Sequence, residues 1–158
     1  MHTIRDLRDD DSQALIELIS SCWAAYPTIV MDVDGEMPHL RAPASAYARL
    51  GGRAWAADGG GGLIGSVAMV PAEPGTAELR MLYVLASERR GGLGRRLLVT
   101  AEQAAAGNGA TRMELWSDTR FTDAHRFYER NGYTRTGASR TLDDLSATVE
   151  WHFTRSLA

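Results

Sequence analysis

One seven-residue stretch decides how this chain is interpreted: Arg89-Arg90-Gly91-Gly92-Leu93-Gly94-Arg95. It follows an extended run at 77–85 and opens a run with helical spacing at 92–107. A glycine-rich turn between a strand and a helix leaves backbone N–H groups free at the positive end of the helix dipole. The glycines carry no Cβ that would keep an anion away, and the arginines add positive charge. The stretch therefore predicts an anion site, for which phosphate is the usual ligand.

Two common phosphate-binding motifs do not fit this turn. A P-loop needs Gly-Lys followed by Ser or Thr, and the chain contains no lysine. A Rossmann fingerprint needs a third glycine, but Gly94 is followed by Arg95-Arg96-Leu97. A tight turn with solvated arginines is the structural alternative to an anion site.

Two motifs, in this order, resemble the signatures of the Gcn5-related N-acetyltransferase (GNAT) superfamily. The first is Q/R-x-x-G-x-G/A after a strand that ends in an aliphatic residue; Arg89, Gly92 and Gly94 fill it, and Val84 is the aliphatic residue. The second is A-x-x-F/L-Y-E-x-x-G-F/Y, and residues 124–133 read Ala-His-Arg-Phe-Tyr-Glu-Arg-Asn-Gly-Tyr. The resemblance covers residues 60–137 closely and the remainder only by the order of its elements.

The expected fold is of the α/β class, with a mixed α+β sheet in a single domain over residues 1–158. Strand-like runs at 53–57, 63–70 and 77–84 are joined by short turns, which predicts three antiparallel strands. The helix at 92–107 and a strand at 113–117 then form a parallel βαβ unit at the anion site. The GNAT resemblance implies the same largely antiparallel central sheet, flanked by helices.

The remaining segments are expected to form shorter elements. A helix should begin near Asp9–Ser12 and end at Pro27, and residues 28–43 should be an irregular acidic loop. A second helix is expected at 44–50, a third from Thr122 or Asp123 to Arg130, and a last strand at 147–154.

The resemblance implies acetyl-CoA as co-substrate and assigns residues to it. Backbone amides of the turn would hold its pyrophosphate, and the pantetheine arm would pair with the main chain of the preceding strand like an added strand. The pyrophosphate residues would be Arg89, Arg90, Gly91, Gly92, Leu93, Gly94 and Arg95, and the pantetheine residues Leu82, Tyr83 and Val84.

The resemblance also implies an acetyl-CoA-dependent N-acetyltransferase in which a primary amine attacks directly in a ternary complex. Tyr128 matches the position of the superfamily's general acid, although an aromatic residue there could instead only pack beside Phe127. Glu78 matches the position of the base in histone acetyltransferases; an exposed strand carboxylate is the alternative. Glu114 and Asp118 compete for the role of base. Many relatives have asparagine where this chain has Phe121.

Composition limits the other function classes. The net charge of -3 argues against a general nucleic-acid binder, and the single cysteine excludes an internal disulfide and a cysteine-based zinc site. No run is long enough for a membrane span and no signal peptide is visible, so a cytoplasmic location without a metal site is expected. The many Ala, Gly and Arg residues and the absence of Lys suggest a GC-rich, bacterial-like genome.

The acceptor is open at this stage. Protein N-termini, lysine, aminoglycosides, polyamines and amino acids are all candidates, and the acidic residues at 32–36 favour a cationic small molecule slightly. A peptide amine and a homodimer are both compatible with the sequence. A non-catalytic acyl-CoA-binding sensor module is the alternative function.

Overall fold

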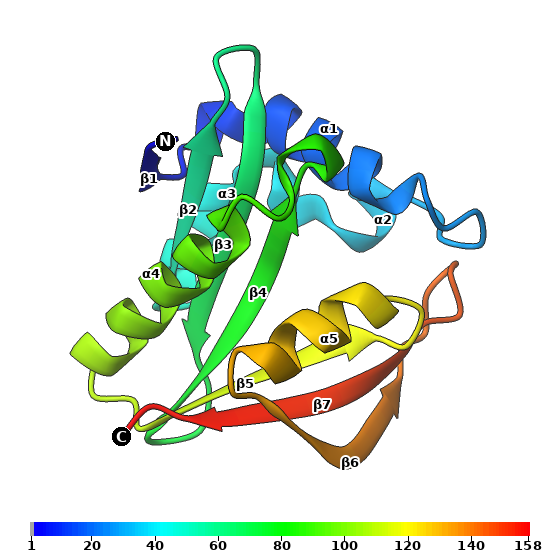
Figure 1. Cartoon of the computed structure of the whole chain (residues 1–158). Coiled ribbons are helices and arrows are strands. Elements are labelled where there is room, and N and C mark those ends of the chain that lie inside the picture. The colour runs from blue at the N-terminus through cyan, green and yellow to red at the C-terminus, as the bar shows by residue number, and fades with distance from the viewer. Residues whose placement is uncertain (1) are drawn as a thin grey trace.

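Seven strands form one mixed sheet in the computed structural model, which describes residues 2–158 (Figure 1). The strand order is β1-β2-β3-β4-β5-β7-β6, and only β4 and β5 are parallel neighbours. The predicted antiparallel meander and the parallel βαβ unit are therefore confirmed, as is the fold class. The strands are β1 (Ile4–Asp6), β2 (Arg53–Asp58), β3 (Leu63–Pro71), β4 (Thr76–Val84), β5 (Arg112–Asp118), β6 (Thr134–Thr141) and β7 (Val149–Ser156).

Helices cover both faces of the sheet. The α-helices are α1 (Ser12–Trp23), α2 (Val33–Glu36), α3 (Pro43–Arg49), α4 (Leu93–Gly107) and α5 (Thr122–Arg130). Single 3-10 turns span Asp9–Asp11, Pro38–Arg41 and Ala86–Glu88. Figure 1 shows α4 and α5 in front of the sheet, with α1 and α3 behind it.

Two expectations about the N-terminal third are corrected by the structure. The first helix ends at Trp23 rather than at Pro27, because residues 24–29 already form turns. The segment 28–43 is not wholly irregular: Asp32 accepts a hydrogen bond from the backbone of Gly35 and caps α2, and Pro38 opens a 3-10 turn. Both short helices lie in the segment expected to border the acceptor.

The core is divided by the sheet into two layers. Leu97, Leu98, Met113, Leu115 and Phe153 are fully buried on the side of α4 and α5. On the other side, α1 and the segment after α2 bury a second apolar cluster, whose most enclosed members are Leu15, Ile19 and Leu40. Each Å² of apolar surface buried contributes about 25 cal/mol, so burial on both faces fixes the sheet between its helices. The sheet therefore holds the side chains and backbone groups of β4 and β5 in fixed positions.

β4 bends away from β5 in the middle of the sheet. In the register with β3, Ser66 lies opposite Tyr83 and Ala68 opposite Arg80, so β4 carries one extra residue. Met81 in this bulge has a positive φ of 54°, and its carbonyl accepts a hydrogen bond from Ser66 Oγ at 2.7 Å. Bulges bend a strand and re-aim its side chains. Pairing with β5 covers only 76–78 with 112–114, after which the two strands diverge.

Candidate active site

The glycine-rich turn presents unbonded backbone donors. The first hydrogen bond of α4 runs from the amide of Arg96 to the carbonyl of Gly92, at 3.1 Å. In the part of the chain that the structure describes, the amides of residues 90–95 donate to no protein acceptor. Gly92 has a φ of 86°, and a Cβ placed there would meet no atom within 4 Å. The turn is therefore an open set of N–H donors at a helix N-terminus, which is the geometry that anions favour.

Two residues of the turn also have structural roles. The Nε of Arg89 donates to the carbonyl oxygen of Val84 at 3.1 Å, so this guanidinium braces the end of β4. Cys22 Sγ lies 3.5 Å from the same oxygen, and burial raises the pKa of the thiol, as expected for a structural cysteine. A Cβ on Gly94 would lie 3.3 Å from Phe127 Cε1, so this glycine permits close contact between α4 and α5. The side chains of residues 90 and 95 are exposed.

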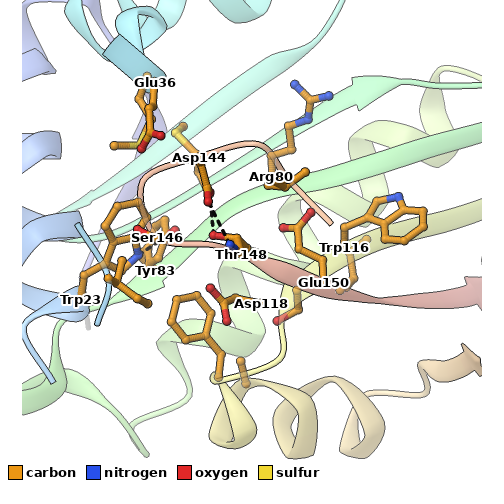
Figure 2. Close-up of a pocket in the computed structure, with 18 of the residues that line it drawn as sticks. Trp23, Glu36, Arg80, Tyr83, Trp116, Asp118, Asp144, Ser146, Thr148 and Glu150 are labelled. Atoms are coloured by element: carbon orange, nitrogen blue, oxygen red, sulfur yellow. Dashed lines mark hydrogen bonds between the residues drawn. The ribbon is translucent and has the colours of Figure 1, made fainter. Parts of the chain in front are cut away.

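A cavity of about 600 Å³ opens where β4 and β5 diverge (Figure 2). Its walls come from β4, β5, α5, the end of α1, α2 with the loop before it, and the loop before β7 with the start of that strand. Aromatic rings line much of it: Trp23, Tyr83, Trp116, Phe121 and Tyr128. The free edge of β4 leads from this cavity to the glycine-rich turn. The structure therefore brings the predicted anion site and the predicted acid to the two ends of one strand edge.

Tyr128 lies in the cavity wall, as its proposed role requires. Its side chain is 8% exposed and packs against the rings of Phe127, Tyr133 and Phe153. Its hydroxyl makes no hydrogen bond to any group in residues 2–158, although it is not sealed from solvent. Burial raises the pKa of Tyr128 well above its ordinary value, so the phenol stays protonated. A protonated, unbonded hydroxyl at a cavity is available to donate to a ligand.

Tyr83 lies beside the same space. Trp23 Nε1 donates to the Tyr83 hydroxyl at 3.2 Å, and the two rings meet edge to face at 6.4 Å. Burial raises the pKa of Tyr83 as well. The sequence indicated only a main-chain role for this residue, whereas its side chain ties α1 to the cavity wall.

Glu78 does not line the cavity. It lies opposite Glu114 in the short parallel pairing of β4 and β5, and Arg80 Nε donates to its carboxylate. Glu114 lies 3.6 Å from His152 Nε2 and is also outside the wall. Asp118 is in the wall, but Arg120 donates to both of its oxygens, at 2.8 and 2.9 Å. The assignment of Glu78 as base stays a prediction, and the group nearest to it in the wall is Arg80.

The acidic wall differs in part from the one suggested by the sequence. Of the acids at 32–36, only Glu36 lines the cavity; Asp34 instead pairs with Arg41. Further acids come from the loop before β7, namely Asp143 and Asp144, and from the start of β7 itself, namely Glu150. The turn that holds Asp143 and Asp144 has no sequence feature that predicts a place in the cavity wall. Only the pairing of β6 with β7 brings this turn close to β4 and β5.

The described residues show no other obvious class of site. Among residues 2–158, no helix has the length and apolar character to cross a bilayer. No group of three or more His, Cys, Asp and Glu side chains in the described chain is arranged to hold a metal ion.

Sequence comparison agrees with this architecture. The model of the acetyltransferase (GNAT) family matches residues 12–133, and the chain belongs to that family. No curated protein sequence matches the chain at a significant level.

Solved structures share the fold over whole chains. A GNAT-family acetyltransferase from Staphylococcus aureus Mu50 is 21% identical, with a TM-score of 0.85 and full coverage of both chains. The PaiA N-acetyltransferase from Thermoplasma acidophilum, in complex with coenzyme A, is 19% identical, with a TM-score of 0.76 and 99% coverage of each chain. An aminoglycoside 6'-N-acetyltransferase complexed with coenzyme A is 18% identical, with a TM-score of 0.72 and coverage of 99% and 97%.

Proposed function

We propose that this acetyltransferase moves an acetyl group from acetyl-CoA to a primary amine, by direct attack within a ternary complex. One observation carries the proposal. The free amides of residues 90–95 and the cavity lined by Tyr128 lie at the two ends of the open edge of β4. Two structural neighbours that contain coenzyme A have the same fold, which supports acyl-CoA as the donor.

The residues of the chain fit such a donor. A diphosphate accepts several N–H donors, and the turn offers them without a side chain in the way at Gly92. Beyond 78, the edge of β4 that faces β5 has no strand partner, so Leu82 to Val84 can pair with an extended arm. At Val84, an N–H of such an arm donates to the carbonyl oxygen alongside the Arg89 guanidinium or displaces that guanidinium. Acetyl-CoA supplies the activated thioester; the protein supplies position and protons.

Tyr128 acts as the general acid in this proposal. The amine nitrogen forms a bond to the acyl carbon while the carbon–sulfur bond breaks, and Tyr128 gives its proton to the departing sulfur. The amine loses its own proton to water in the cavity. After product release, a proton from that water returns to the Tyr128 phenolate. Glu78, which pairs with Arg80 and does not line the cavity, would accept that proton only through water. Backbone amides of β4 near the bulge would stabilise the negative charge on oxygen.

The experiment is a direct one. Release of the CoA thiol is measured with acetyl-CoA and a panel of primary amines, and calorimetry measures acetyl-CoA binding in parallel. Amine-dependent thiol release with tight binding supports the proposal. Tight binding without any transfer indicates a non-catalytic acyl-CoA-binding module, and absence of both refutes the use of acetyl-CoA.

A further inference from the structure

We infer that the acceptor is a small amine with at least one further positive charge, and that the site excludes amines on folded proteins. The inference rests on the proposed function, because it assigns the acceptor class of the same cavity. Three features carry it: the closure of the cavity, the unpaired carboxylates in its wall, and the unbonded hydroxyl of Tyr128.

The cavity is closed on one side by two segments that are far apart in the chain. The amide of Val30 donates to Ser146 Oγ at 2.8 Å, and that hydroxyl lies 3.3 Å from the carbonyl of Val30. The amide of Leu145 donates to Glu36 Oε2 at 2.7 Å. Arg120 joins the same segments, since its Nη1 lies 3.1 Å from Thr28 Oγ1 and 3.2 Å from the carbonyl oxygen of Ser146. These contacts hold 28–36 against 145–146.

The size of the cavity limits what can enter. A volume of about 600 Å³ lies within the range of sites that bury small molecules. A lysine on a folded protein would bring its surrounding surface against the joined segments, which border the cavity on that side. A free small amine meets no such obstacle.

The charge of the wall is uneven. Glu150 pairs with Arg140 at 2.7 Å, and Asp118 pairs with Arg120 at 2.8 Å. Among the described residues, none of Glu36, Asp143 and Asp144 has a cationic side chain within ion-pair distance. Figure 2 shows Glu36 and Asp144 on the upper side of the cavity, with Asp118 below. Unneutralised carboxylates in a concave wall attract and hold a cation.

A second observation points independently to a ligand. The Tyr128 side chain is more than nine-tenths buried, lines the cavity and has a hydroxyl without a partner in residues 2–158. The rings of Tyr83 and Phe121 line the same cavity. An apolar, aromatic surrounding favours the neutral form of an amine, which is the form that attacks. A second ammonium group on the same molecule would instead lie near Glu36 and Asp144.

A pair of amines that differ in one ammonium group tests whether the carboxylates hold the second charge. With 1,4-diaminobutane and 1-aminobutane we expect kcat/KM to favour the diamine by about tenfold or more at low ionic strength, the ratio shrinking as salt is added. Calorimetry of both amines with the CoA-bound protein measures the same preference without any transfer. A folded protein with many surface lysines should not be acetylated at a comparable rate.

Variants that remove one negative charge show which carboxylates cause the preference for the diamine. Glu36→Gln keeps an acceptor for the amide of Leu145, and Asp143→Asn removes a carboxylate that makes no side-chain hydrogen bond within the described chain. Each should lower the preference for the diamine about threefold to tenfold. Glu73→Gln, in the exposed turn before β4, removes the same charge far from the cavity and is the matched control.

The outcomes separate this inference from the proposed function. Equal binding and equal kcat/KM for the two amines, or efficient acetylation of the folded protein, would overturn the acceptor class while leaving acetyl transfer intact. Absence of transfer to every amine would instead refute the proposed function. In that case the calorimetric preference still decides the inference: selective binding of the diamine supports it, and its absence refutes it.

Discussion

Replacing Tyr128 by Phe removes one oxygen from the cavity wall and should separate catalysis from folding. The hydroxyl makes no hydrogen bond in the described chain, so the variant loses no hydrogen bond within the protein. We expect its free energy of unfolding to stay within about 0.5 kcal/mol of the wild type. A general acid contributes about 10²–10⁴-fold, so kcat should fall at least about a hundredfold, which is about 2.7 kcal/mol of barrier.

Three measurements check this prediction together: thiol release at saturating substrates, calorimetric affinity for CoA, and urea unfolding. Tyr133→Phe is the matched control, because the Tyr133 hydroxyl is buried and donates to Glu102 at 2.7 Å. That variant should lose about 1–2 kcal/mol of stability and keep kcat within a few-fold. If Tyr128→Phe keeps kcat within twofold while CoA still binds, the tyrosine is not the acid.

Three further predictions concern stability. Arg155→Ala should cost about 2 kcal/mol in urea unfolding, because Glu102 is 7% exposed and would lose its cation. Arg5 lowers the pKa of Asp11 below 3.8, so this stabilisation is complete above about pH 4 and is lost as the pH falls further; Asp11→Asn should remove that acid-range loss. Burial lowers the pKa of His125 below 6.5, so unfolding free energy should fall below about pH 6.5, at most about 1.4 kcal/mol per pH unit; the slope should be absent in His125→Gln.

The central elements could be predicted from local patterns. The turn at 89–95, the helix after it and the strands on both sides carry their own periodicity and glycine signals, and the structure places them within a residue or two of the prediction. Tyr128 lies in the cavity wall because the face of α5 that carries it packs on the sheet; its role as acid stays a prediction.

The acceptor side was less predictable for a physical reason. Glu36 and Ser146 are held in place by hydrogen bonds between segments more than a hundred residues apart, and no local pattern encodes such a pairing. The bulge at Met81 was equally hidden, since a positive φ at a non-glycine residue has no sequence signature. The contact between the Nε of Arg89 and the carbonyl oxygen of Val84 was not foreseen either, and the role of Arg89 at the anion site stays a prediction.

A crystal structure of the protein with bound CoA tests the account most directly. We predict diphosphate oxygens on the amides of residues 90–95, the pantetheine arm along Leu82 to Val84, and the sulfur within hydrogen-bond reach of the Tyr128 hydroxyl. A diphosphate bound elsewhere, or a sulfur directed away from that phenol, would contradict it.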